Sequence, residues 1–302
     1  MSGVYRELAE ALLAVDRDHR PLNMGVAAQL ACLLEVSAPK PGNVSPGRHF
    51  DDLRYEDFLA SALAIGEPLA RAGECSVGST IRLAIEATAK LTRSNTNLGI
   101  VLLFAPLARA ASLPGENLQS AVKTVLDATT VDDARETYAA FRLARPGGLD
   151  RAESQDVFTE PTMTLVEVMR LAAHRDTIAS EYATGFDVTF GMGVPALERA
   201  RRDGLAWDDA VVETFLTLLA AVPDTHIARR SGPGLAANVT ERARQVLAAG
   251  GVRSEAGRRG IDDLDRGLRD ARNSGNPGTT ADLTAAAIFV VLLGGGFSHA
   301  AE

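Results

Sequence analysis

Apolar residues recur with helical spacing along almost the whole 302-residue chain, and this periodicity limits the fold more than any other feature. The pattern predicts helices over residues 4–16, 23–36, 55–72, 76–91, 95–111, 118–129, 132–144, 163–183, 193–202, 207–221, 235–249, 261–271 and 279–293. Proline should bend the third of these near Pro68 and kink or break the fifth at Pro106. Residues 186–190 are the only strand-like stretch, and one strand cannot form a sheet. We therefore expect residues 1–302 to fold as a single compact all-α domain.

The composition agrees with closely packed helices and excludes some partners. Hydrophobic residues make up 46% of the chain and aromatic residues only 5%, which indicates a core of Ala, Leu and Val. The net charge of −8 and the lack of a basic stripe argue against nucleic acid as a partner. Cys32 and Cys75 have no CxxC spacing, so we expect small hydrophobes in a reducing compartment.

Neither a signal peptide nor a membrane span is expected. Residues 1–18 carry charges throughout, unlike the apolar centre of a signal peptide. The longest apolar run, residues 285–293, is about half the length that crosses a bilayer. We therefore expect a soluble, cytoplasmic protein that binds small molecules and no membrane. The sequence leaves open whether it forms a homodimer.

Four polar loops interrupt the helical pattern, at residues 35–52, 94–100, 223–234 and 273–283. Prolines and glycines in the first and last loops should hold the backbone in fixed turns. Each loop leads towards the start of a helix, where unpaired N–H groups and the helix dipole favour anions. Together with nearby arginines, the loops predict one pocket for a nucleotide or another polyphosphate.

Ordinary structural explanations compete with this interpretation. Asn95 or Thr96 could be a helix N-cap, and Thr279 with Asp282 fits the T-x-x-D capping pattern. His226 could be a hydrogen-bonded core histidine, and Arg229 with Arg230 a solvated pair. For each residue alone the structural explanation is the stronger one, but four such loops in one helical domain favour a site.

The motifs PKPGNV, GRHFD, NTNLG, DTHIARRSG and NPGTTADL, in this order, resemble those of the triphosphoribosyl-dephospho-CoA synthase family. The resemblance runs from about residue 30 to residue 293 and is weak in the middle third. It implies an all-helical enzyme that uses ATP and Mg²⁺. Such an enzyme transfers the 5-triphosphoribosyl unit of ATP to a ribose hydroxyl of dephospho-CoA and releases adenine.

The resemblance also implies roles for individual residues, each carried over from a matching motif position. The predicted catalytic residues are Glu35, His49 and Asp51, with Glu35 or His49 as the general base. Phosphates and nucleotide should be bound by Lys40, Asn95, Thr96, Arg230 and Gly278. The predicted metal ligands are Asp51, Asp224 and Asp282.

Some positions depart from the family motifs. Asn97 and Leu98 stand where the family has His and Lys, Ser45 replaces an Asp, and His226 replaces an Asn. Residues 134–162 and 175–190 have no counterpart that we can place. The missing Lys at Leu98 predicts that dephospho-CoA is a poor acceptor and that an intermediate of another cofactor pathway takes its place. A nucleoside or ADP-ribose hydrolase and a non-catalytic nucleotide-binding protein remain alternatives.

Overall fold

The computed structural model describes residues 23–115, 117–147, 154–270 and 273–295. Within these ranges the chain is helical and contains no strand, as expected. The helices are α2 (Met24–Ser37), α3 (Tyr55–Ala64), α4 (Gly66–Ala70), α5 (Val77–Leu91), α6 (Leu98–Ala111), α7 (Leu118–Asp127), α8 (Val131–Ala144), α9 (Leu165–Ala172), α10 (Thr177–Thr184), η1 (Thr189–Gly193), α11 (Val194–Arg202), α12 (Trp207–Ala221), α13 (Thr225–Ser231), α14 (Pro233–Ala248), η2 (Gly251–Arg253), α15 (Glu255–Leu268) and α16 (Gly278–Leu293). The predicted helix 4–16 lies outside the described residues.

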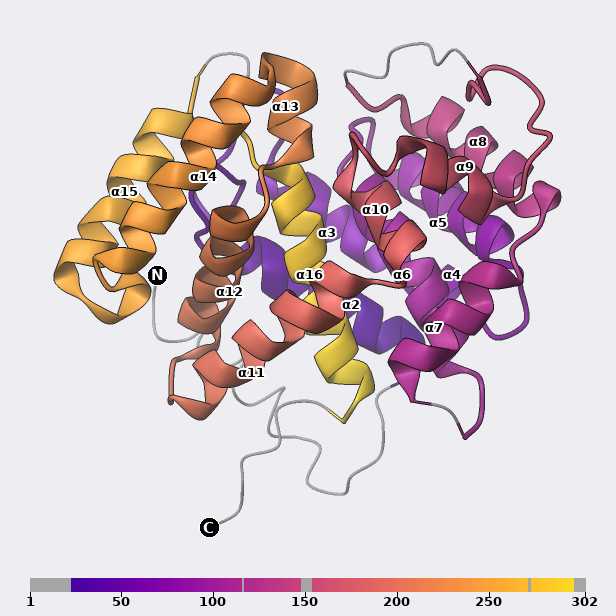
Figure 1. Cartoon of the computed structure of the whole chain (residues 1–302), viewed down its shortest axis with the longest axis horizontal. Coiled ribbons are helices and arrows are strands. Elements are labelled where there is room, and N and C mark those ends of the chain that lie inside the picture. The colour runs from indigo at the N-terminus through magenta and orange to yellow at the C-terminus, as the bar shows by residue number, and fades with distance from the viewer. Residues whose placement is uncertain (1–22, 116, 148–153, 271–272, 296–302) are drawn as a thin grey trace.

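Helix α16 runs through the middle of the molecule beside α2, with α12–α15 on one side and α5–α10 on the other (Figure 1). It packs against α2, α6 and α12, and every residue from Leu283 to Leu292 is buried. A helix that is apolar on all sides is stable only where protein surrounds it. Phe289 stacks on Phe104 of α6 with 4.3 Å between the ring centroids. The sequence of α16 therefore places it at the centre of the core.

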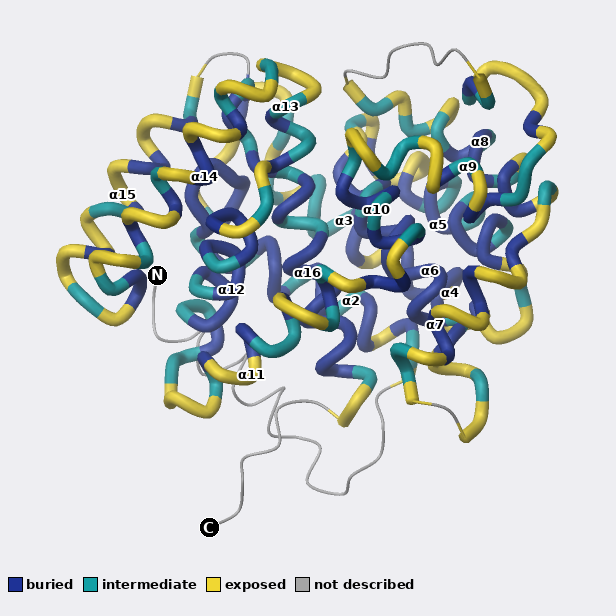
Figure 2. Tube along the Cα trace, in the orientation of Figure 1, coloured by how far each residue is buried: buried dark blue, intermediate teal, exposed yellow. Residues whose placement is uncertain are grey.

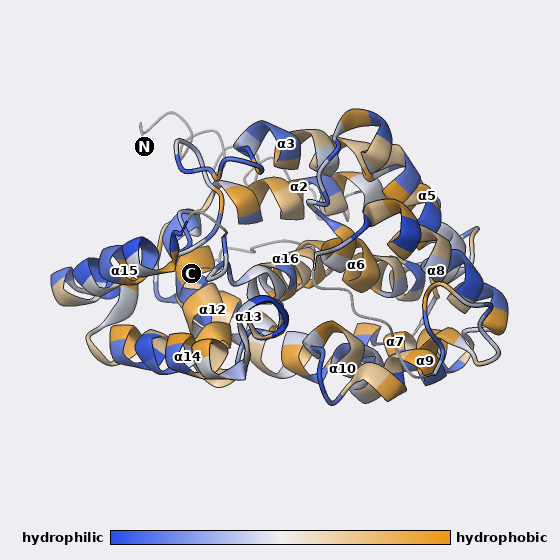
Figure 3. Ribbon diagram, turned by 90° about the horizontal axis from the view of Figure 1, so that it is seen from above, coloured by the Kyte–Doolittle hydropathy of each residue, from blue (hydrophilic) through white to orange (hydrophobic). Residues whose placement is uncertain are grey.

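The outer helices are buried on one face only. Figure 2 shows exposed residues along the outer faces of α11, α14 and α15, whereas the central helices are buried. Figure 3 shows the same division as polar and apolar stripes on α14 and α15. This is the pattern that helical spacing of apolar residues predicts.

The strand-like residues 186–190 do not form a strand: Phe186 is a bend, and residues 187–190 are helical. The chain turns at Gly185, where φ is +75°, and re-enters a helix that becomes the π-helix η1. The buried carboxylate of Glu181 accepts hydrogen bonds from the backbone N–H groups of Val188 and Thr189, both at 2.9 Å. These bonds satisfy the amides that a strand would have paired with a neighbouring strand.

Two predicted helices are each divided into two. The helix expected over 163–183 is interrupted between α9 and α10, where Asp176 caps α10 by accepting from Ala179 N at 3.0 Å. The helix expected over 55–72 is interrupted at Ile65, before Pro68 rather than at it.

Helix α6 continues through Pro106 without the predicted break. Proline has no N–H, so the carbonyl of Leu102, four residues earlier, loses its usual helical partner. The hydroxyl of Tyr182 in α10 donates to this carbonyl at 2.6 Å. A side chain from a neighbouring helix therefore replaces the missing backbone hydrogen bond and ties α10 to α6.

Among the described helices, none by itself combines the length and apolar character needed to cross a bilayer. The pair α12 and α13 meets that criterion only when taken together, and it is bent by 59° at the break.

The hydrogen bond between Tyr182 and Leu102 predicts a specific coupling. Tyr182→Phe should lower the free energy of unfolding by about 1–3 kcal/mol, because it leaves a buried carbonyl unpaired. In a Pro106→Ala background the new N–H of residue 106 can pair with Leu102 O, so the same substitution should cost about 1 kcal/mol less. Denaturant unfolding of the four proteins measures this coupling. Equal costs in the two backgrounds would contradict the prediction.

Candidate active site

A cavity of about 940 Å³ lies where the four polar loops meet. Glu35 and Asn43 of the first loop, Asn95 of the second, His226 of the third and Gly278 of the fourth all line it. Residues of all four predicted loops therefore line one cavity, but the loop predicted over 223–234 is wrong in part. Residues 225–231 form the helix α13, because Asp224 caps its start by accepting from Ile227 N. Residues from α8, α9 and α10 complete the wall. The volume lies within the range of about 300–1,000 Å³ that is usual for small-molecule sites.

Glu35 lines the cavity from the last turn of α2, and Lys40 holds it there. The chain leaves α2 at Ala38 and turns back, so that Lys40 Nζ donates to the carbonyls of Glu35 and Ala38. Nζ also lies 2.9 Å from Glu35 Oε1, and both side chains are buried. These contacts occupy the three donors of the ammonium group. Lys40 does not line the cavity, so its position suits neutralising Glu35 rather than binding phosphate.

Asp282 is the second carboxylate on this part of the cavity wall. Burial raises the pKa of Asp282 well above its ordinary value, and the nearby carboxylates of Glu35 and Asp224 raise it further. Burial raises the pKa of the Cys32 thiol, and the carboxylates of Glu35 and Asp282 raise it further. Glu35 of α2 and Asp282 of α16 both line the cavity and repel each other, and we call them the acidic pair.

The N-terminus of α6 lies directly against Asp282. A Cβ atom placed on Gly99, the second residue of α6, would come within 2.0 Å of Asp282 Oδ2. Only glycine leaves room for this approach, which brings the carboxylate to the positive end of the α6 dipole. The match of Gly99 to the third family motif thus has a steric reason.

Asp224 lies below the cavity wall and caps two helices. Its Oδ1 accepts from Ile227 N of α13 at 2.9 Å, and its Oδ2 accepts from Thr280 N of α16 at 2.7 Å and from Thr280 Oγ1 at 2.8 Å. Asp224 is buried and does not line the cavity. Its oxygen atoms are engaged in capping, and the structure offers them no cavity-facing position for a metal ion.

The T-x-x-D explanation for Asp282 is wrong. Helix α16 starts at Gly278 with Pro277 as its N-cap residue, and it has no side-chain cap of its own. Thr279 is the second helical residue, and its hydroxyl accepts from Thr225 at 3.2 Å. Because Asp224 caps this helix from α13, Asp282 is left to face the cavity.

His226 lines the cavity beside the first residue of α16. A Cβ on Gly278 would lie 3.2 Å from its ring, so glycine at that position makes room for the imidazole. Burial, followed by the positive charges of Arg229 and Arg230, lowers the pKa of His226 to about 4. The ring is therefore neutral near pH 7.

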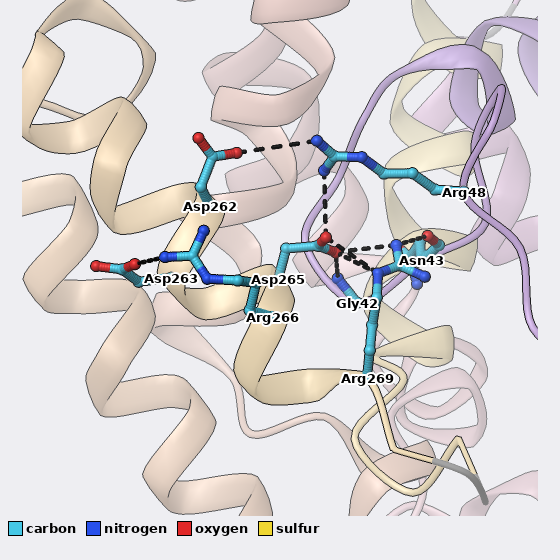
Figure 4. A network of polar contacts seen from close by, with 8 residues as sticks. All are labelled: Gly42, Asn43, Arg48, Asp262, Asp263, Asp265, Arg266 and Arg269. Carbon is cyan, nitrogen blue, oxygen red and sulfur yellow. Dashed lines mark hydrogen bonds and ion pairs between the residues drawn. The ribbon is translucent and has the colours of Figure 1, made fainter.

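Helix α15 fixes the first loop through Asp265, as Figure 4 shows. Asp265 accepts from Gly42 N at 2.7 Å and pairs with Arg48 and Arg269, at 3.2 and 2.9 Å. Arg269 also donates to the carbonyl of Asn43 at 2.6 Å. A charged pair four residues apart on an exposed helix is common, so the sequence did not identify Asp265 as the anchor of this loop.

The other predicted residues are distributed unevenly around the cavity. Arg230, Gly278, Asn95 and Thr96 line it, although the Thr96 hydroxyl is hydrogen bonded to Ser61 and Asn95 Oδ1 accepts from Leu98 N at 3.2 Å.

His49 and Asp51 are exposed and do not line the cavity. Asp52 lines it instead and accepts from Asn273 at 2.6 Å. Motif matching selected the neighbouring aspartate, since spacing alone cannot tell which of two adjacent carboxylates turns inward.

Glu35 and Asp282 are suited to hold a magnesium ion together with a nucleotide. No group of three or more His, Cys, Asp or Glu residues able to hold a metal ion occurs among the described residues. Mg²⁺ usually needs only one or two carboxylates, because water and substrate phosphates supply its other oxygen ligands. The acidic pair offers this donor set, and a cation would offset both the burial and the repulsion that raise the pKa of Asp282.

Sequence reasoning also missed two arginines, Arg145 and Arg175, which line the cavity from the ends of α8 and α9. Arg145 is the C-cap residue of α8, and Arg175 precedes the N-cap of α10. Neither position carries a motif. Only the packing of α8, α9 and α10 beside the cavity brings them to the site.

Known proteins of one family resemble this chain. A probable 2-(5''-triphosphoribosyl)-3'-dephosphocoenzyme-A synthase of Pseudomonas putida is 40% identical over 106 residues, which is 35% of this chain and 37% of that protein. The chain thus matches little more than a third of the length of that relative. A protein of the same name from Pseudomonas syringae pv. syringae is 29% identical over 84% of both chains.

A crystal structure and a family model extend the match over most of the chain. The structure, provisionally identified as a triphosphoribosyl-dephospho-CoA synthase from Archaeoglobus fulgidus, superposes with a TM-score of 0.63 and 27% identity. It covers 80% of this chain and 100% of its own. The family model described as ATP:dephospho-CoA triphosphoribosyl transferase matches residues 21–300. The chain therefore belongs to the ATP:dephospho-CoA triphosphoribosyl transferase family.

Proposed function

We propose that this protein transfers the 5-triphosphoribosyl group of ATP to dephospho-CoA and releases adenine. The observation that carries the proposal is the acidic pair of Glu35 and Asp282, placed in a large cavity where all four motif-bearing loops meet. Membership of the family supports ATP as the donor and dephospho-CoA as the acceptor. The cavity supports a site for small molecules.

The reaction forms a bond from an acceptor hydroxyl oxygen to C1′ of the ATP ribose and breaks the bond from C1′ to adenine. The hydroxyl loses a proton, adenine gains one, and positive charge develops on the sugar during the exchange. Carboxylates beside C1′ stabilise that charge, and one of them can accept the hydroxyl proton. Glu35 is our candidate base rather than His49, because Glu35 lines the cavity and His49 is exposed.

The triphosphate would lie near the start of α16. Gly278 opens this helix at the cavity, and Arg230 lines the cavity from α13. A helix N-terminus and a guanidinium group both favour phosphate oxygens. Asp282, with Glu35 beside it, is the proposed carboxylate ligand of Mg²⁺, which when bound would neutralise part of the triphosphate charge. Lys40 does not contact the substrate in this proposal and instead holds the carboxylate of Glu35 in place.

The comparisons lend no support to a changed acceptor, a hydrolase or a non-catalytic protein. An apolar residue suits position 98, where the family has Lys, because Leu98 lines the cavity and is only 4% exposed. Adenine release from ATP and Mg²⁺ tests the proposal. Release that depends on dephospho-CoA supports it, release without an acceptor indicates a hydrolase, and no release in either case overturns it.

Asp282→Asn should lower the rate of adenine release by at least about 100-fold, because it removes a charge placed beside the reacting sugar and the metal. Asp127→Asn is a matched control, since Asp127 is exposed at the end of α7 and pairs only with Arg170 among the described residues. Steady-state rates at saturating ATP and Mg²⁺ measure the effect. Full activity of Asp282→Asn would remove this carboxylate from the mechanism.

Asp282→Asn should also make the protein more stable at neutral pH when no metal or nucleotide is bound. The pKa of Asp282 is raised on folding, so above the ordinary value near 3.8 the folded state binds more protons than the unfolded state. The free energy of unfolding of the wild-type protein therefore falls as the pH rises above about 3.8. Asparagine does not ionise, so the variant does not lose this stability.

The expected result is a higher melting temperature for Asp282→Asn at pH 7, with a difference that shrinks towards pH 3. Thermal unfolding of both proteins across this range, in the presence of a chelator, measures it. A variant that is less stable than the parent at pH 7 would show that the carboxylate is stabilised in the folded state.

A further inference from the structure

The cavity has two chemically different sides. Figure 3 shows α2 and α3 on one side of α6 and α16, and α9 and α10 on the other. Glu35 of the acidic pair comes from α2 on the first side, and Asp282 comes from α16 between the two sides. On the second side the cavity is lined by apolar side chains of α8, α9 and α10, namely Phe141, Leu165, Val168, Met169, Leu171 and Ile178. We call these six residues the apolar wall.

Four arginines gather at the edge of the apolar wall. Arg229 of α13 pairs with Asp176, the residue that follows Arg175. A Cβ on Gly147 would lie 4.0 Å from Arg230 Nη1, so the chain that leaves α8 at Arg145 approaches α13. Arg145 has φ +47°, a left-handed conformation that turns the chain away from the helix axis. These contacts bring positive charge from three helices to one edge.

Arg145 and Arg175 differ from their neighbours in having no described partner. No ion pair or hydrogen bond to another described residue involves either guanidinium group, and both residues are exposed. Arg142, on the last turn of α8, donates to the carbonyl of Val157, and Arg170 of α9 pairs with Asp127 at 3.5 Å. Arg145 and Arg175 line the cavity without a described partner, so both are available to a charged ligand.

We propose that Arg145 and Arg175 bind the diphosphate of the acceptor, and that the apolar wall binds the long uncharged chain attached to it. This inference rests on the proposed function. ATP has no such chain, whereas the pantetheine arm of dephospho-CoA is uncharged and follows directly from a diphosphate. Arg145 directly follows α8, which carries Phe141, and Arg175 follows the end of α9, which carries Leu171. All four residues line the same cavity.

The assignment separates the two substrates within one cavity. The triphosphate of ATP lies at Arg230 and the start of α16, and the acceptor enters along α8 and α9. Leu171 is 46% exposed although it lines the cavity, and a large apolar side chain in that position gains stabilisation when a ligand covers it. Glu35 of α2 lies across the cavity from the apolar wall, so the ribose hydroxyl of the acceptor reaches Glu35 from the side of that wall.

The test compares Arg145→Gln and Arg175→Gln with Arg142→Gln and Arg170→Gln, which lie on the same two segments and have protein partners. Each of the first two should raise KM for dephospho-CoA about tenfold, the loss expected for one charge-assisted contact to phosphate. KM for ATP, and the Kd for ATP measured by calorimetry, should stay within about twofold. The controls should change neither value. Leu171→Ser should raise KM for dephospho-CoA alone, through the lost apolar contact.

Two results would overturn the assignment. A loss of ATP affinity as large as the loss for dephospho-CoA would place the triphosphate on these arginines. Unchanged constants for both substrates would show that neither arginine meets an anion.

If the wild-type protein releases no adenine, the proposed function fails, and calorimetry with dephospho-CoA alone still decides the subsite. Binding to the wild type that is weakened by the double variant Arg145→Gln/Arg175→Gln supports it. Binding that is absent, or equal in the two proteins, refutes it.

Discussion

The structure depends on burying one wholly apolar helix, α16, without leaving its first amides unpaired. A helix start that is removed from water needs acceptors for its N–H groups, and α16 carries no cap of its own. Asp224 supplies the acceptor from α13 while also capping α13 itself. One carboxylate therefore fixes the ends of two helices side by side. That junction sets the positions of His226 and Gly278, and it leaves Asp282 facing the cavity.

The acidic pair at the cavity is stabilised unequally by its surroundings. Lys40 neutralises Glu35 through a buried ion pair, whereas Asp282 has no described cationic partner at hydrogen-bond distance and its pKa is raised. Breaking a buried pair by removing one partner typically costs about 3–5 kcal/mol, so Lys40 and Glu35 are expected to be retained together. The pairing is feasible because the chain leaves α2 in an extended conformation at Ala38, and Lys40 Nζ then reaches back to the carbonyls of Glu35 and Ala38.

Several features were predictable because they depend on local chemistry. The boundaries of α12 agree with the predicted range 207–221, since apolar periodicity is a property of the segment itself. The loop character of 94–97 and 273–277 follows in the same way from polar and glycine-rich sequence. The strand-like pattern of residues 186–190 gave a wrong prediction. The carboxylate of Glu181 in the preceding helix accepts from the amides of Val188 and Thr189, and these bonds outweigh the local strand propensity.

The sequence by itself determined the all-helical fold, the loops that carry the site and the family to which the chain belongs. Each of these follows from the spacing of residues along the chain, which is the same before and after folding. Only the tertiary structure decided which polar side chains reach the cavity. Asp52 lines the cavity while Asp51 does not, although both are exposed, and Arg145 and Arg175 join the cavity wall without any motif. The direction of a side chain depends on the packing of helices distant in sequence, and that packing is set by the burial of α16 at the centre.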